Sequence, residues 1–219
     1  MKILLAAFFS ILFVSLSAQP KFKGGQKNLN SLIINNLIYP EYSKQNCLQA
    51  TIEVSFKVDK EGRVVESHVE KGPGIDLDKE ALRIVRLTSG KWIVPPDYDT
   101  SVALVMPISF SLKEYNCEKV SKDDLKASIA AYKAREDLTN AVLNFYDKKA
   151  SGNYKPDDEM QIIELKAQLG YDEKFLNRTV KQGQRKLKQG DRQGACEDFN
   201  FVRRLGSNKA DQLIEENCR

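Results

Sequence analysis

The chain has 219 residues, of which 42% are hydrophobic and 29% are charged. This composition can bury one or two ordinary cores and excludes an intrinsically disordered chain. The formal net charge of +4 is spread over interspersed cations and anions, so charge gives no reason to expect a nucleic-acid partner. The stretch closest to a basic patch, 181–188, is interpreted as a solvated helix face.

The chain begins with Met1-Lys2 and an uncharged apolar run over 3–18 that ends in small residues. This run is about two residues short of a membrane span, so we predict a secretory signal peptide over 1–18. The alternative is a retained inner-membrane anchor. Export would place the four cysteines where disulfides form, and proximity in sequence favours Cys47 with Cys117 and Cys196 with Cys218.

A helix, a hairpin and a second helix are expected next. After Gly24-Gly25, apolar residues recur at helical spacing until Tyr39-Pro40. Strict alternation over 50–58 predicts a strand with one buried face, 59–62 reads as a tight turn, and 63–70 returns as a second strand. Asp76 is the expected N-cap of a helix over 77–87, and 92–100 is expected to be an extended connection.

The last strand is expected over 102–112 and has the most apolar alternation in the chain. One face carries Val102, Leu104, Met106, Ile108, Phe110 and Leu112. Pro107 lies on the other face, and because proline cannot donate to a ladder it is nearly confined to edge strands or bulges. We therefore predict that this strand lies at the edge of the sheet.

From Ser121 onward helix formers dominate, and helices are expected over 122–149, 156–169, 172–188, 191–204 and 208–217. The predicted fold class is α+β: a small three-stranded antiparallel sheet with two helices, followed by an all-α region. The expected domains are 22–115 and 121–219, with a boundary in the charged stretch 118–124.

The order of elements in the first domain resembles the C-terminal domain of TonB, in the version common in Bacteroidetes. The matching motifs are Phe22-x-Gly24-Gly25, Asn36-Leu37-x-Tyr39-Pro40, Val58-Asp59-x-x-Gly62-Arg63-Val64, Asp76-Leu77-Asp78-Lys79-Glu80-Ala81-Leu82-Arg83, Trp92 with Pro95, and Met106-Pro107-Ile108-Ser109-Phe110. Together they cover about 40% of the chain.

The resemblance implies a protein-binding module that has no catalytic activity, lies in the periplasm and takes part in TonB-dependent transport. The implied partner is the TonB box, an extended segment of an outer-membrane transporter, which is captured by strand addition at an exposed edge. The implied binding strand comprises Val102, Ala103, Leu104, Val105, Met106, Pro107, Ile108, Ser109 and Phe110. Pro107 either removes one donor from the docking ladder or simply blunts an edge that would otherwise be prone to aggregate.

Direct energy transduction is doubtful, because a transducer needs an anchor and a long spacer. Only Gln19 to Phe22 separate the leader from the domain, and four residues reach at most about 14 Å. An alternative function is a periplasmic interaction scaffold that acts through its helical tail. The tail resembles a tetratricopeptide hairpin, with Gly183, Ala195, Phe199 and Val202 at the packing positions. The alternative is an amphipathic helical hairpin that packs on its neighbours, since a stable array needs about three repeats.

The disulfide predictions rest on geometry. Antiparallel helices over 196–205 and 208–218 would bring Cys196 level with Cys218. Cys47 can reach Cys117 only if the first and last strands are neighbours, which gives strand order 2-1-3. In the order 1-2-3 the two thiols would lie at opposite ends of the sheet.

No enzyme is expected. His68 is the sole histidine and alternates outward with Glu66 and Glu70, and the usual catalytic and metal-binding spacings do not occur. The acidic cluster Asp76, Asp78 and Glu80 is interpreted as helix capping rather than a calcium site. We expect no metal, no cofactor and no small-molecule substrate, and the sequence does not indicate an oligomeric state.

Overall fold

The computed structural model describes residues 19–113, 115 and 117–218. The predicted signal peptide over 1–18 lies outside the described residues. Among the helices that are described, none is both long and apolar enough to cross a lipid bilayer.

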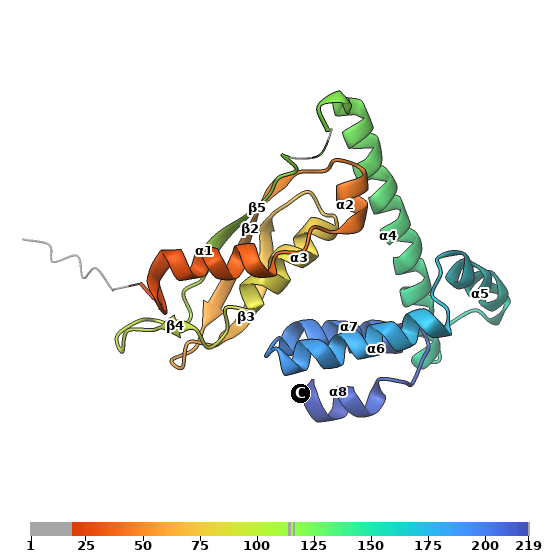
Figure 1. The fold of residues 1–219 in the computed structure, drawn as a ribbon. Helices are drawn as coiled ribbons and strands as arrows, with labels where there is room; N and C mark the ends of the chain where they lie inside the picture. Colours follow the sequence, from red (N-terminus) through yellow and green to blue (C-terminus); the bar gives the residue numbers. More distant parts are fainter. Residues whose placement is uncertain (1–18, 114, 116, 219) are drawn as a thin grey trace, which may run out of the picture.

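A three-stranded antiparallel sheet forms the centre of the first part of the chain (Figure 1). It contains β2 (Ala50–Val58), β3 (Val64–Lys71) and β5 (Leu104–Phe110) in the order β3-β2-β5. In both views α1 (Gly25–Asn36) and α3 (Asp76–Arg86) lie over one face of this sheet. The α+β prediction is confirmed, and the strand order is the one that allows Cys47 to meet Cys117.

The period-2 pattern of β2 produces the core as expected. Ile52, Val54 and Val58 are fully buried on the face that meets α3. The matching stripe of α3 includes Leu77 and Ile84, which are also fully buried. Burying large apolar side chains contributes about 1.5–3 kcal/mol each, so this layer stabilises the sheet.

Two local expectations were wrong. The last strand begins at Leu104 and ends at Phe110, and Val102 is half exposed in the preceding bend. Asp76 is the first residue of α3 rather than its N-cap, which is Ile75. The Asp76 carboxylate instead accepts hydrogen bonds from the hydroxyl and backbone N–H of Ser43.

Short elements complete the first part. Strands β1 (Lys21–Phe22) and β4 (Trp92–Ile93) form a separate antiparallel pair, and α2 (Glu41–Gln45) precedes β2. The turn between β2 and β3 packs closely against β4, because a Cβ on Gly62 would lie 2.1 Å from the Trp92 carbonyl oxygen. Gly62 also has φ of 78°, which glycine adopts without strain.

The second part of the chain is helical. It comprises α4 (Lys122–Ala150), α5 (Glu159–Gln168), α6 (Glu173–Lys188), α7 (Arg192–Arg204) and α8 (Asp211–Asn217), with short 3-10 turns at Cys117–Lys119 and Pro156–Asp158. Helices α6 and α7 pack so closely that a Cβ on Gly183 would lie 2.4 Å from the Phe199 ring. Gly183, Ala195, Phe199 and Val202 are all buried. The tetratricopeptide resemblance stays a prediction.

Helix α4 belongs to both hydrophobic cores. Leu125, Ile129 and Tyr132 in its first half pack against the core of the sheet, whereas Val142 and Leu143 in its second half are buried in the helical core. Figure 1 shows α4 running from the sheet to the other helices. The division into 22–115 and 121–219 therefore stays a proposal, with α4 as a shared element.

Both predicted disulfides are present. Cys47 bonds Cys117 across 70 residues, and Cys196 bonds Cys218 across 22 residues. The first joins the entry of β2 to the segment that follows β5, and the second fixes α8 to α7. Among the described residues no cysteine is free.

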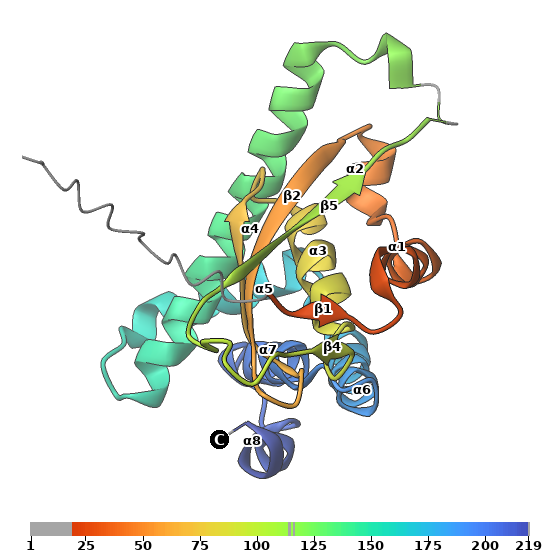
Figure 2. The same ribbon diagram turned by 90° about the vertical axis from the view of Figure 1, so that its left-hand side faces the viewer.

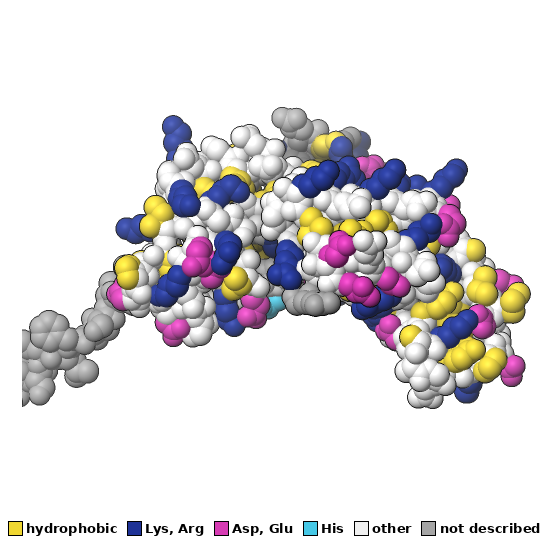
Figure 3. Space-filling view, turned by 90° about the horizontal axis from the view of Figure 1, so that it is seen from below, with side chains coloured by type: hydrophobic (Ala, Val, Ile, Leu, Met, Phe, Trp, Pro, Cys, Tyr) yellow, Lys and Arg dark blue, Asp and Glu magenta, His cyan; other side chains and the backbone are white. Residues whose placement is uncertain are grey.

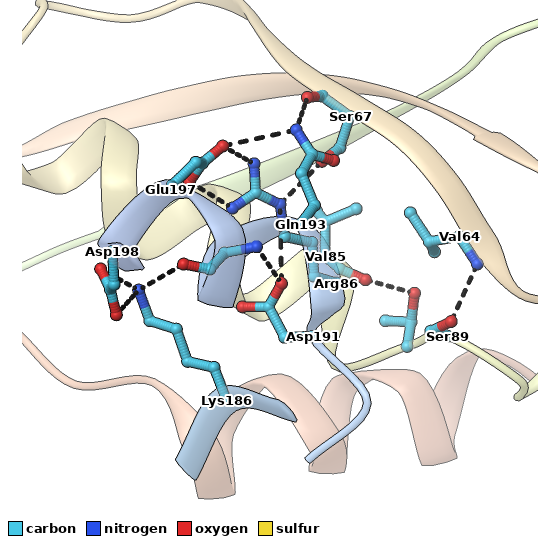
Figure 4. A network of polar contacts seen from close by, with 12 residues as sticks. Val64, Ser67, Val85, Arg86, Ser89, Lys186, Asp191, Gln193, Glu197 and Asp198 are labelled. Atoms are coloured by element: carbon cyan, nitrogen blue, oxygen red, sulfur yellow. Dashed lines mark hydrogen bonds and ion pairs between the residues drawn. The ribbon is translucent and has the colours of Figure 1, made fainter. Parts of the chain in front are cut away.

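A polar network joins the sheet to the helices (Figure 4). The buried guanidinium of Arg86 in α3 donates two hydrogen bonds of 2.8 and 2.9 Å to the Glu197 carboxylate in α7, and a third of 2.9 Å to the Ser67 hydroxyl in β3. Gln193 of α7 also hydrogen-bonds Ser67. These contacts fix the position of α7 relative to β3 and α3.

Asp191 is the buried anion of this network. Its Oδ1 caps α7 by accepting from the Gly194 N–H and lies 4.0 Å from Arg86 Nε, while its Oδ2 has no hydrogen-bond partner among the described residues. Burial raises the pKa of the Asp191 carboxyl above its ordinary 3.8, and the Gly194 N–H and Arg86 only partly oppose this. The folded protein thus holds this proton more tightly than the unfolded chain. Its contribution to stability is largest below pH 3.8 and falls as pH rises through the raised pKa.

Candidate functional site

The outer side of β5 is an open sheet edge. Of the described strands, only β2 pairs with β5, through an unbroken register from Ala50 opposite Phe110 to Phe56 opposite Leu104. Figure 2 faces this edge, with β5 in front of β2. An open edge exposes unpaired backbone N–H and C=O groups that can pair with another chain.

The register fixes which backbone groups of β5 point outward. Pro107 pairs with Glu53, and a hydrogen-bonded antiparallel pair would require an N–H from both residues. Proline has none, so this pair must be of the non-hydrogen-bonded kind. The backbone groups of Pro107 therefore point away from β2, to the open side.

The same alternation applies to the rest of the strand. Val105 and Ser109 share the orientation of Pro107, because backbone groups two residues apart point the same way. The Ser109 hydroxyl lies 2.9 Å from the Thr51 hydroxyl, as expected for the close side chains of a non-hydrogen-bonded pair. The open edge thus offers carbonyls at three positions but N–H donors at only two.

A groove runs beside the first half of this edge. Its volume is about 630 Å³, and one wall is β5 with the residue before it, from Ala103 to Pro107. The opposite wall comes from β1 and the start of α1, including Phe22, Gln26 and Leu29. A strand added to β5 would direct alternate side chains toward the helix-covered face, where this groove lies.

The aromatic residues of the groove are held in place. The Trp92 ring packs edge-on against Phe22, with centroids 5.6 Å apart, and against Phe56 at 5.3 Å. Trp92 Nε1 donates a 2.9 Å hydrogen bond to the Thr88 hydroxyl, which in turn donates to the Val85 carbonyl. The aromatic part of the groove is therefore preformed rather than ordered by a ligand.

Seven of the nine proposed binding residues lie in β5: Leu104, Val105, Met106, Pro107, Ile108, Ser109 and Phe110. Their side chains alternate between the two faces of the sheet, and those of Met106, Ile108 and Phe110 are buried in the core. Val102 and Ala103 precede the strand, and Ala103 lines the groove. The groove wall formed by β1 and the start of α1 was not predicted as a site, although Phe22 and Gly25 of the Phe22-x-Gly24-Gly25 motif line it.

The titratable residues singled out in the sequence do not converge. His68 is exposed, and its Nε2 lies 3.7 Å from a Glu70 carboxylate oxygen. In the acidic cluster, Asp78 accepts from the Gly74 N–H and Glu80 pairs with Arg83. Within the described part of the chain, no group of three or more candidate ligands is placed to hold a metal ion.

Comparison with known proteins supports the resemblance seen in the sequence. Residues 35–112 match the family described as Gram-negative bacterial TonB protein C-terminal. The solution NMR structure of the Helicobacter pylori TonB C-terminal domain is similar at 24% identity, covering 41% of this chain and 95% of that one, with a TM-score of 0.34. No curated protein matches the chain significantly. The expectation is thus confirmed, and residues 35–112 belong to the TonB C-terminal domain family.

Proposed function

We propose that this protein captures an extended peptide segment of an outer-membrane transporter by strand addition to β5, within TonB-dependent transport in the periplasm. The domain acts as a binding module and performs no chemistry. The partner segment pairs with the outward backbone groups of Val105, Pro107 and Ser109. Its alternate side chains enter the groove between β5 and α1, which selects among partners.

The observation that carries this proposal is the coincidence of an unpaired edge with a groove that has both polar and aromatic walls. The edge supplies main-chain hydrogen bonds that are independent of sequence, whereas the groove lined by Phe22, Trp92 and Met106 discriminates between side chains. Family membership of residues 35–112 supports the same role. The helical region would then hold or orient the binding domain.

The test is a substitution that changes only the outer side of the edge. Val105→Pro removes an outward donor and leaves the ladder to β2 intact, since the Val105 nitrogen does not face β2. Met106→Pro serves as the contrast, because it removes a donor within the β2–β5 ladder and should destabilise the fold. Binding is measured by fluorescence anisotropy, using synthetic TonB-box peptides from the outer-membrane transporters of the same organism.

The expected result is that Val105→Pro keeps the unfolding curve of the wild type but weakens peptide binding at least tenfold. This magnitude combines a lost hydrogen bond of about 0.5–1.5 kcal/mol with the steric bulk of the proline ring against an incoming strand. Equal affinity of a folded Val105→Pro variant and the wild type would reject the edge as the binding site. The scaffold function through the helical tail would then be favoured.

A further inference from the structure

Five basic side chains form a continuous stripe on α6. Lys174, Arg178, Lys181, Arg185 and Lys188 follow the spacing i, i+4, i+7, i+11 and i+14. At 3.6 residues per turn they fall within an arc of about 80° and extend about 21 Å along the axis. No other residue of α6 lies in this arc, so the stripe is wholly cationic.

The fold does not account for this stripe. All five side chains are exposed, and none forms an ion pair with another described residue. Lys186, the remaining cation of this run, points elsewhere and pairs with Asp198. Cations three and four positions apart on a helix repel one another, and only Arg185 and Lys188, in the last turn, gain from the negative end of the helix dipole.

The stripe is presented on a rigid surface. Leu176, Val180 and Leu187, on the opposite side of α6, pack in the helical core, so this face cannot turn inward. A depression of about 570 Å³ runs along the helix, lined by four of the five cations. Figure 3 shows Lys and Arg side chains gathered in a row over α6.

Helix α1 and the residues just after it carry exposed apolar side chains. Helix α1 lies on the same side as α6 in Figures 1 and 2. Ile34 in α1 is 75% exposed, and Ile38 just after it is 64% exposed. Surface cations together with exposed apolar side chains favour binding to the interface of an anionic bilayer.

We propose that the α6 stripe docks the protein on an anionic lipid surface. The centre of a stable protein–protein interface usually contains apolar anchors, and the arc carries no apolar side chain. A bilayer with mobile anionic headgroups can neutralise all five cations together without a matching shape. Because the apolar face of α6 is buried, the helix binds from the surface and does not insert.

The proposal is tested by flotation of the full-length chain with vesicles. Phosphatidylcholine vesicles are compared with vesicles containing equal parts of phosphatidylcholine and phosphatidylglycerol, so that any binding through the N-terminal apolar run appears in both. The variant is Lys181→Gln with Arg185→Gln. The matched control, Lys119→Gln with Lys122→Gln, removes the same charge at the end of the 3-10 turn Cys117–Lys119 and at the first residue of α4.

Each cation near an anionic leaflet contributes about a fivefold factor to binding, so the stripe variant should bind anionic vesicles about 25-fold more weakly. The control and the charge-conserving variant Lys181→Arg with Arg185→Lys should bind like the wild type. Wild-type binding should also fall steeply as salt is raised. No preference of the wild type for anionic vesicles, or equal binding by the stripe variant, would overturn the proposal. Binding of poly-glutamate without binding of anionic vesicles would also overturn it and identify an acidic polypeptide as the partner.

Discussion

Replacing Pro107 by valine should strengthen peptide binding at the β5 edge. The register places the Pro107 nitrogen on the open side, opposite the ladder to β2. A valine there adds one outward N–H between those of Val105 and Ser109, so an added strand gains one main-chain hydrogen bond. One such bond contributes about 0.5–1.5 kcal/mol, which lowers the dissociation constant by about 2- to 12-fold.

The assay is a titration of labelled TonB-box peptide against wild type and Pro107→Val, with the free energy of unfolding measured in parallel. Unfolding should change by no more than about 1 kcal/mol, because the substitution acts mainly on unfolded-chain entropy. Unchanged or weaker binding by the folded variant would refute the assignment of Pro107 to the docking ladder. If sedimentation then showed self-association of the variant, the role of Pro107 would be to blunt the edge.

Three further predictions concern stability, each measured by urea unfolding. Arg86→Met should lower the free energy of unfolding by about 3 kcal/mol, because it removes the guanidinium that lies 4.0 Å from buried Asp191 and donates to Ser67. Glu197→Gln, whose side chain is 54% exposed, should cost under about 1 kcal/mol, and equal losses would contradict this reasoning. Asp191→Asn removes the titrating carboxyl whose pKa is raised. The free energy of unfolding of the wild type should therefore fall relative to that of this variant as pH rises above 3.8. Parallel curves of unfolding free energy against pH would contradict this expectation. Cys196→Ser opens a 22-residue loop and should cost about 3 kcal/mol, whereas no loss would show that the disulfide does not stabilise the chain in solution.

The sheet could be predicted from the sequence because its signals are local. Strict alternation over 50–58 is enough to define a strand, and one proline in the last strand places that strand at the edge. The helix spacing of Cys196 and Cys218 likewise sufficed to pair them. Each of these inferences needs only residues that are close in sequence, or two regular elements joined by a short turn.

The groove could not be predicted because its walls come from distant parts of the chain. Phe22, Trp92 and Met106 come together only when β1 pairs with β4. Strands of two residues are too short to show the period-2 pattern by which a strand is predicted from sequence. Asp76 shows the same limit, since a contact with Ser43 in α2 replaced the expected helix cap. In sequence, such residues look like ordinary turn or surface positions.

The Cys47–Cys117 disulfide determines how the sheet responds to a pull on β5. It ties the entry of β2 to the segment after β5, and nearby the Leu112 N–H donates a 2.7 Å hydrogen bond to the Gln49 side chain. The two strands are thus covalently closed at the Phe110 end. Under mechanical load the disulfide resists separation of β2 and β5 at the Phe110 end, so we expect the pair to open first at Leu104, the end beside the groove.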